Sequence, residues 1–230
     1  MPIEDIAKVL DKGEPILVFD DSQREGETDI FFSARHVTPA SVRFLRKQGG
    51  GMVFLASDYA ASEKLGLPFT QDLYRSVTPD SGEFDLLDGM LSHSLPYDTR
   101  SSFSLFINHK DTFTGITDND RALTAKSFAE LMQESSYSSS TDWKVKMAQN
   151  FRIPGHVPIC IANRELLQGR QGHTELIIAL MSLLNLTPVA LGCEMLSDDG
   201  NALSPEEAQT WARKEGYLFL EGRQIVETCQ

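Results

Sequence analysis

Short apolar runs, each bounded by polar or turn-forming residues, recur along the chain and predict the strands of a sheet. "PILVFD" is a compact apolar run that follows a proline, whereas "SFSLFIN" alternates between apolar and polar positions, as a half-buried strand does. The strands predicted in this way cover residues 15–20, 29–34, 51–57, 102–108, 157–162 and 188–196.

Apolar residues at helical spacing predict helices around these strands. Thr38 and Pro39 suit the N-cap and the first position of a helix that ends near Gln48, and Ser204 suits the start of a helix that ends near Gly216. The other helices are predicted at the N-terminus through Ile3, Ile6, Ala7 and Leu10, over residues 121–134, and along the apolar run 176–184.

Two segments between the predicted elements lack such periodicity. Residues 66–100 carry prolines and turn residues, and residues 134–143 are rich in serine, so both are predicted to be surface excursions or lids. Neither is expected to link two domains, because core-like strands continue on each side. We therefore expect an α+β fold formed by one mixed domain over residues 1–230, with helices layered on a mostly central β-sheet.

Composition narrows the classes of function. Hydrophobic residues make up 41% and charged residues 23% of the chain, as in ordinary globular proteins, and the formal charge of −12 argues against nucleic-acid or anionic-membrane partners. The longest apolar stretch is far shorter than the roughly 20 residues that a membrane span requires, and the N-terminus lacks the pattern of a secretion signal. The 3 cysteines are widely separated and form no CxxC, so we expect a cytoplasmic protein without a disulfide framework or a structural zinc site.

An acidic loop follows the first predicted strand. In "FDDSQREGETD", residues 19–29, carboxylates crowd around Arg24. The spacing is not that of a calcium-binding EF-hand loop. Two interpretations remain open for this loop: a solvated acidic turn, or a site in which one or two carboxylates hold a hard cation.

A second candidate site opens the most apolar helix. The stretch "GRQGHTE" brings Arg170, His173 and Thr174 to the predicted helix start, where backbone N–H groups are free and the helix dipole favours anions. Thr174 is expected to cap this helix, with Arg170 beside it. The combination indicates a phosphate site with an imidazole next to it, although a histidine at a helix start often has only a capping or packing role.

Two further side chains are candidates for proton transfer. His156 follows a Pro-Gly turn at the start of a predicted strand, and a histidine there can exchange protons near neutral pH. Glu194 interrupts an apolar strand, where an unpaired carboxylate is costly, so it is expected to have a function. Asp120 and Arg121 in the segment 112–124 fit a helix cap and a solvated charge pair.

Five motifs, in their order between residues 20 and 203, resemble those of the 3,4-dihydroxy-2-butanone 4-phosphate synthases of riboflavin biosynthesis. They are "DDSQREGETD", "TGITDNDRALT", "PGHV", "GRQGHTE" and "CEMLSDDGNALS". The "REGETD" variant and the long segment before "SSFSLFINH" resemble archaeal members, and a monofunctional form is expected because no GTP cyclohydrolase II domain follows. The resemblance implies a magnesium-dependent lyase that converts D-ribulose 5-phosphate to 3,4-dihydroxy-2-butanone 4-phosphate and formate, in a homodimer with shared active sites.

The resemblance also implies roles for individual residues. Glu25 and His173 would be metal ligands, with Glu27 a further ligand through water, for two magnesium ions per active site; manganese is expected to substitute because histidine is a softer ligand than magnesium prefers. His156 and Glu194 would be catalytic. The implied substrate-binding residues are Arg24, Glu25, Asp29, Arg170, Gln171, Gly172, His173, Thr174 and Glu194, with Arg170 and Thr174 at the phosphate.

These roles agree with the chemistry that a pentulose phosphate requires. Its enolisation needs a divalent cation on the carbonyl and hydroxyl oxygens and a side chain that removes a carbon-bound proton. Two other functions fit the same residues: a metal-dependent phosphosugar isomerase or aldolase, which would release no formate, and a noncatalytic module that binds pentulose phosphate.

One departure from the family concerns a cysteine. Many members have a cysteine where this chain has Phe54. We therefore predict that no thiol is essential, and Cys193, which precedes Glu194, is the only cysteine near a proposed catalytic residue.

Overall fold

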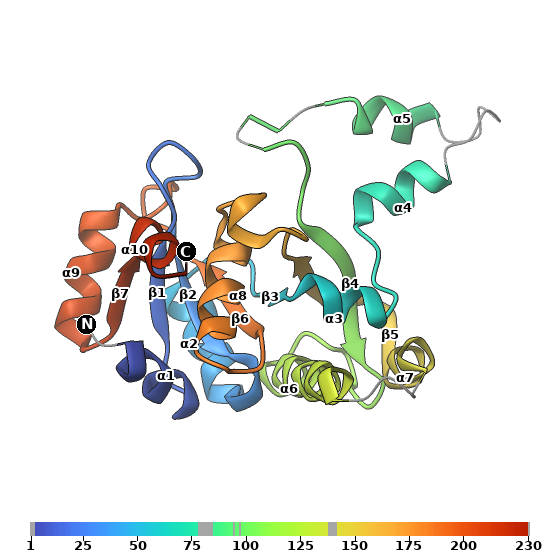
Figure 1. Ribbon diagram of the computed structural model, residues 1–230, viewed down its shortest axis with the longest axis horizontal. Coiled ribbons are helices and arrows are strands. Elements are labelled where there is room, and N and C mark those ends of the chain that lie inside the picture. The colour runs from blue at the N-terminus through green and yellow to red at the C-terminus, as the bar shows by residue number, and fades with distance from the viewer. Residues whose placement is uncertain (1–2, 78–84, 94, 97, 138–141, 230) are drawn as a thin grey trace.

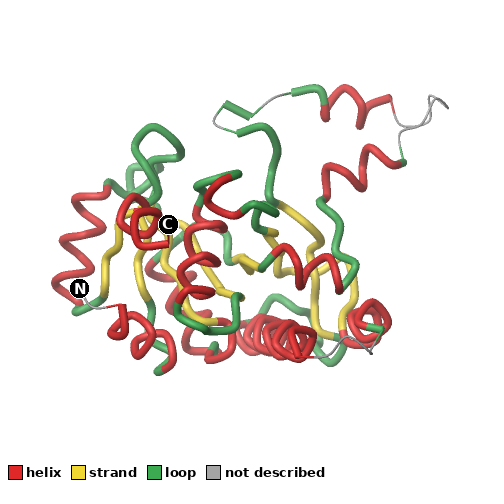
Figure 2. The backbone as a smooth tube through the Cα atoms, viewed as in Figure 1, coloured by secondary structure: helices red, strands yellow, loops and turns green. Residues whose placement is uncertain are grey.

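One mixed sheet forms the centre of the protein (Figures 1 and 2). The computed structural model describes residues 3–77, 85–93, 95–96, 98–137 and 142–229. Within these ranges the strands are β1 (Ile16–Phe19), β2 (Thr28–Ser33), β3 (Phe54–Ser57), β4 (Phe103–His109), β5 (Phe151–Ile161), β6 (Val189–Glu194) and β7 (Leu218–Glu221). All of the predicted strands are confirmed, whereas β7 was not predicted.

The strand order is β4-β5-β3-β6-β2-β1-β7. The β3–β5 and β1–β7 pairs are parallel, and the other neighbours are antiparallel. In the antiparallel register of β2 against β6, Asp29, near the start of β2, lies opposite Glu194, the last residue of β6. The acidic loop that precedes β2 therefore lies beside the carboxylate that ends β6, although the two are far apart in the sequence.

Helices cover both faces of the sheet, as Figure 1 shows. They are α1 (Ile3–Asp11), α2 (Pro39–Gln48), α3 (Tyr59–Lys64), α4 (Thr70–Ser76), α5 (Asp85–Leu91), α6 (Asp118–Tyr137), α7 (Trp143–Asn150), α8 (His173–Leu183), α9 (Pro205–Glu215) and α10 (Gly222–Cys229). None of these helices, within the described ranges, has both the length and the apolar character that a membrane crossing requires.

Two apolar cores lie on opposite faces of the sheet, because neighbouring residues of a strand point to opposite sides. In β3, Phe54 and Ala56 pack in the core that contains α1, α8 and α10, whereas Leu55 packs in the core that contains α2, α6 and α9. This arrangement confirms the predicted α+β fold with a central sheet between helices.

Local capping explains where two predicted helices begin. Thr38 and Ser41 form a reciprocal capping box at the start of α2, in which each side chain accepts a hydrogen bond from the backbone of the other. The Ser204 hydroxyl accepts a hydrogen bond from the Glu207 N–H at 3.3 Å, and Gly216 ends α9 in the left-handed conformation with φ of 81°. Both helices therefore begin and end where the sequence predicted.

The aperiodic segments contain helices that were not predicted. In residues 66–100, α4 and α5 stand apart from the layered body and form an arm above β4 (Figure 1). In residues 134–143, α6 continues to Tyr137 and α7 begins at Trp143. Residues 78–84, 94, 97 and 138–141 of these two segments lie outside the described residues.

Candidate active site

The loop that joins β1 to β2 is organised by Asp20. Its fully buried carboxylate accepts hydrogen bonds from the backbone N–H groups of Glu25 at 3.1 Å and Glu27 at 3.0 Å. Gly26, with φ of 69°, makes a turn in the region that favours glycine. These contacts fix the loop so that Glu25 and Glu27 meet the start of α8.

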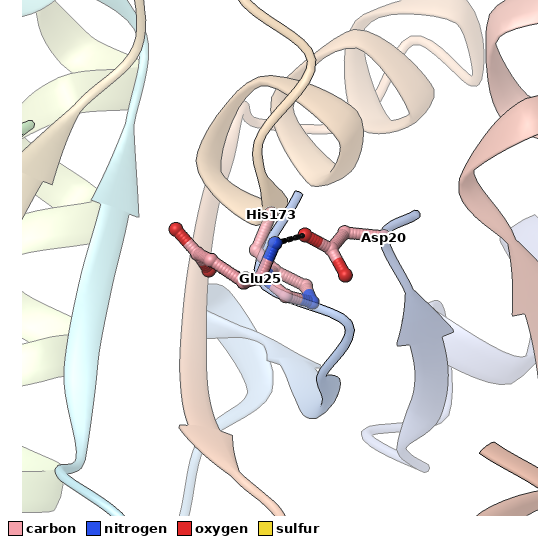
Figure 3. Close-up of side chains that lie close together, drawn as sticks. All are labelled: Asp20, Glu25 and His173. Atoms are coloured by element: carbon pink, nitrogen blue, oxygen red, sulfur yellow. Dashed lines mark hydrogen bonds and ion pairs between the residues drawn. The ribbon is translucent and has the colours of Figure 1, made fainter. Parts of the chain in front are cut away.

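α8 contributes His173, its first residue, to the contact with the β1–β2 loop. Its Nδ1 lies 3.2 Å from Glu25 Oε2, and its Nε2 lies 3.1 Å from the Glu27 carbonyl oxygen and 3.7 Å from Asp29 Oδ1. Figure 3 shows the carboxylates of Asp20 and Glu25 on either side of the ring. Asp20, Glu25 and His173 each offer a ligand atom, and these atoms all lie within 4.8 Å of one another.

The surrounding carboxylates control the charge of His173. Burial alone would lower the pKa of the imidazole, but the charges of Asp29, Glu25 and Asp20 outweigh burial and raise it to about 9. Burial would raise the pKa of Glu25, but its hydrogen bond to His173 and the positive charges nearby lower it. Without a metal ion, this pair is therefore an imidazolium next to a carboxylate at neutral pH.

The start of α8 differs from the expectation in one respect. Gly172, not Thr174, is the N-cap: it has extended backbone angles of −85° and 170°, and no side chain caps this turn. Thr174 lies inside the first helical turn and is buried. The predicted cap at Thr174 is therefore wrong, but the uncapped helix start is better suited to an external anion.

Two arginines lie next to this helix start and hold an anion between them. Arg24 Nη2 lies 3.1 Å from Asp98 Oδ2, and the same oxygen accepts a hydrogen bond from Arg170 Nε. Arg170 Nη1 also donates to the buried Glu175 carboxylate at 2.5 Å. A Cβ on Gly172 would lie 2.2 Å from Arg170 Nη1, so a larger residue there would displace this guanidinium from its present position.

Glu194, at the end of β6, is a further carboxylate of this site. Its Oε2 accepts a hydrogen bond from the Met52 N–H at 2.7 Å, and a Cβ on Gly51 would lie 2.3 Å from that oxygen. Burial raises the pKa of Glu194 despite its backbone hydrogen bonds. Burial also raises the pKa of Asp29, to about 8, against the pull of His173 and with the support of neighbouring carboxylates. Both carboxyl groups can therefore carry a proton closer to neutral pH than usual.

These side chains line one cleft with a volume of roughly 360 Å³, within the range of small-molecule sites. Asp29 Oδ1 is buried and has no hydrogen-bond partner among the described residues, so a ligand hydroxyl could satisfy it. The predicted residues that line the cleft are Arg24, Glu25, Glu27, Asp29, Arg170, His173, Thr174 and Glu194. Gly172 lies directly under the arginines, and the Gln171 amide donates instead to the Leu167 carbonyl at 3.3 Å.

His156 is the predicted site residue that the structure places elsewhere. It is exposed on β5 and is not among the described residues that line the cleft. Four apolar side chains are exposed on β4, on β5 and in the loop after β4; we refer to them as the β4–β5 surface. They are Phe106 (40% exposed), Phe113 (94%), Ile116 (51%) and Ile153 (60%).

Sequence reasoning missed two acidic partners and misplaced a thiol. Asp98 lies in the segment 66–100, which was predicted to be a surface excursion or lid. Glu175 was predicted only as part of a helix start, and its ion pair with Arg170 was not expected. Cys193 packs in the core on the face that carries α2, whereas Cys160 lines the cleft. Burial raises the pKa of the Cys160 thiol to about 12, so it stays protonated.

The arrangement combines a cation site with an anion site. Carboxylate oxygens and one imidazole lie next to two guanidinium groups and an uncapped helix start, and Arg24 Nη1 lies 3.1 Å from Glu25 Oε1. Such a site can bind a small phosphorylated ligand whose oxygens share a divalent cation.

Comparisons with known proteins agree with this geometry. The family model for 3,4-dihydroxy-2-butanone 4-phosphate synthase matches residues 4–228. The synthase of Methanothermobacter thermautotrophicus is 40% identical over 227 residues, which cover 98% of this chain and 95% of the relative. The synthase of Methanosarcina mazei is 44% identical over 224 residues, which cover 96% of this chain and 87% of the relative.

Solved structures of such synthases share the fold. That of Candida albicans has a TM-score of 0.72 at 26% identity and covers 100% of this chain and 98% of its own. A synthase structure in complex with two magnesium ions has a TM-score of 0.73 at 20% identity, with 99% and 96% of the chains covered. The chain therefore belongs to the 3,4-dihydroxy-2-butanone 4-phosphate synthase family and is an enzyme of riboflavin biosynthesis.

Proposed function

We propose that the chain converts D-ribulose 5-phosphate to 3,4-dihydroxy-2-butanone 4-phosphate and formate, as a magnesium-dependent lyase that acts as one domain over residues 1–230. The observation that supports this proposal is that one cleft contains both His173 with its neighbouring carboxylates and the two arginines beside the uncapped start of α8. A ligand with a phosphate at one end and several hydroxyl groups at the other matches that division.

The donor set fits magnesium. We assign the metal to Glu25 and His173, with Glu27 a further ligand through water, because the Asp20 carboxylate already accepts hydrogen bonds from the loop on both oxygens. A synthase of this fold in complex with two magnesium ions supports two ions per site, and manganese should substitute at the imidazole. When bound, the cation stabilises negative charge on the carbonyl and hydroxyl oxygens of an enolising sugar.

Different residues of the cleft would bind the phosphate, bind a sugar hydroxyl and transfer protons. Arg170, Thr174 and the backbone N–H groups after Gly172 would bind the phosphate, since the Asp98 carboxylate shows that an anion fits between the arginines. Asp29, whose Oδ1 is without a hydrogen-bond partner in the described part of the chain, would accept a sugar hydroxyl. Glu194, with its raised pKa, would accept and return protons at the sugar carbons or hydroxyls.

The position of His156 supports a homodimer with shared active sites. The residue lies outside the cleft of its own chain, and it shares β5 and the neighbouring β4 with exposed apolar side chains of the β4–β5 surface, which a partner subunit would cover. If a two-fold interface covers this surface, the His156 of each chain enters the cleft of the other. Each of the two sites would then contain the cation and anion groups of one chain and the histidine of its neighbour.

The products decide among the functions that fit the site. We expect purified protein with magnesium to release formate and a four-carbon phosphate from D-ribulose 5-phosphate in equal amounts. An isomerase or aldolase would give an isomeric pentose phosphate or shorter fragments without formate, and a binding module would leave the substrate unchanged. Either result would refute the proposed lyase reaction.

A further inference from the structure

The side chain of His156 is held by one neighbour on β4. Asn108 is buried, and its Nδ2 lies 3.1 Å from His156 Nδ1. The Asn108 Oδ1 accepts a hydrogen bond from the backbone N–H of His156 at 2.9 Å. One amide therefore binds both the backbone and the ring of the same residue.

These two contacts fix the orientation of the Asn108 amide. A backbone N–H can only donate, so the atom that faces it must be the amide oxygen. The amide nitrogen, which can only donate, then faces the ring and also lies 3.5 Å from the Thr114 carbonyl oxygen. His156 Nδ1 must accept a hydrogen bond, and the neutral ring carries its proton on Nε2.

The surrounding chain is built around this amide. Residues 153–156 bulge out of β5, because Val157 pairs with Ile107 whereas Arg152 pairs with Asn108, the next residue on β4. A Cβ on Gly115, whose φ is 94°, would lie 2.0 Å from Asn108 Nδ2.

The loop that contains Gly115 is itself fixed. The Asp120 carboxylate accepts a hydrogen bond from the Gly115 N–H at 2.8 Å. The helix-start carboxylate therefore closes the loop over Asn108. This gives the "TGITDND" stretch a structural purpose beyond the cap and charge pair that the sequence suggested.

We propose that Asn108 is a positioning residue that holds neutral His156 as the Nε2–H tautomer. His156 then meets the substrate as a hydrogen-bond donor to an oxygen that gains negative charge, and not as the base that first removes a proton from carbon. A neutral imidazole has this role in known enolising enzymes. The base for the first step is then left to a carboxylate of the cleft. This inference rests on the proposed function for its catalytic part, whereas the tautomer follows from the geometry alone.

Nitrogen NMR tests the tautomer without any assay of activity. Protein with nitrogen-15-labelled histidine contains 5 such residues, and the His156→Gln variant identifies the signals of His156 by their loss. We expect an unprotonated Nδ1 and a protonated Nε2 in the neutral ring. In Asn108→Asp, the new carboxylate can only accept, so the proton should move to Nδ1. A protonated Nδ1 in the neutral ring of the parent protein would overturn the proposal.

Kinetics test the consequence. Because Asn108→Asp would remove the donor at Nε2, we expect kcat to fall by about 10²-fold to 10³-fold with little change in KM, as for the loss of one oxyanion donor. Asn150→Asp is the matched control: its amide donates to the Lys146 carbonyl at 2.9 Å, away from His156, and kcat should be kept. If Asn108→Asp does not fold, Asn108→Ala replaces it, with a mixture of tautomers and a smaller fall in kcat expected.

The outcomes separate the two claims. An inverted tautomer with unchanged kcat would show that the donor is not needed and would overturn the catalytic part. If the parent protein releases no formate, the proposed function fails, but the nitrogen signals still decide whether Asn108 sets the tautomer.

Discussion

Metal binding to this cleft should be linked strongly to protons, because the proposed ligand His173 is protonated in the metal-free protein. The carboxylates around the ring raise its pKa to about 9. Only the neutral imidazole binds a metal ion, so a cation must displace this proton. At pH 7 the difference of about 2 pH units makes the apparent affinity roughly 100-fold weaker than the intrinsic one.

The sign of the effect follows from the direction of the shift. A raised pKa means that protonation competes with the metal at every pH below about 9, so affinity should rise about tenfold per pH unit between pH 6 and 8 and level off above pH 9. Asp29, whose pKa is also raised, adds in the same direction because a nearby cation would favour loss of its proton. At least one proton should therefore be released for each metal ion bound, which sets the slope of log affinity against pH.

Isothermal titration with magnesium or manganese, in buffers with different ionisation enthalpies, measures both the affinity and the protons released. Asp29→Asn removes a buried carboxyl group that, like His173, should lose its proton when the cation binds, so it should lower the number of protons released per ion and flatten the pH dependence of the affinity. Asp21→Asn is the matched control, since Asp21 is exposed in the same loop. An affinity that is independent of pH from 6 to 8, without proton release, would refute His173 as a ligand.

Three further predictions concern the rest of the site. Loss of a charge-assisted phosphate contact in Arg170→Ala should lower kcat/KM by roughly tenfold to 150-fold and weaken inhibition by inorganic phosphate. Both proteins, with and without Arg170→Ala, carry Glu175→Gln, which avoids an unpaired buried carboxylate. Equal inhibition of the two proteins by phosphate would exclude Arg170 from the phosphate site. Cys160→Ser should keep most activity, since the thiol stays protonated with a pKa of about 12, and loss of turnover in a folded, metal-binding variant would make a thiol essential. The Glu25→Ala and His156→Ala proteins are each expected to be inactive alone, but a mixture of the two should regain about a quarter of the parent activity on subunit exchange. About half of the dimers are then mixed, and each mixed dimer has one intact site of two. Subunit exchange without recovery of activity would mean that the site is not shared.

The fold was largely predictable because its signals are local. Apolar runs gave the strands on both sides of the site, and side-chain caps at Thr38 and Ser204 gave the starts of two helices. The elements that were missed, such as α3 and β7, are only 6 and 4 residues long, and their periodicity is too short to be distinctive. The arm of α4 and α5 was missed because its apolar residues, among them Leu86 and Met90, are exposed and form no continuous buried stripe.

The site was predictable where residues are neighbours in the sequence and unpredictable where the fold brings them together. Arg170, His173 and Thr174 share one turn, so their pattern is visible in the sequence. The bridge from Asp98 to Arg24 joins residues 74 positions apart, and the support of Glu194 by the Met52 backbone joins residues 142 positions apart. The cap at Thr174 was predicted wrongly because a glycine N-cap leaves no side-chain signal.

Formate release as a function of divalent cation is the measurement that tests the central claim most directly. The parent protein and the Glu25→Gln variant are freed of metal, given D-ribulose 5-phosphate, and titrated with magnesium while formate is followed. We predict that formate from the parent protein rises from zero to a plateau with added magnesium, and that the variant, which keeps the shape of the loop but loses a charged ligand, stays near zero over the same range. Full formate release by the parent protein after exhaustive chelation, or equal release by the variant, would contradict the account.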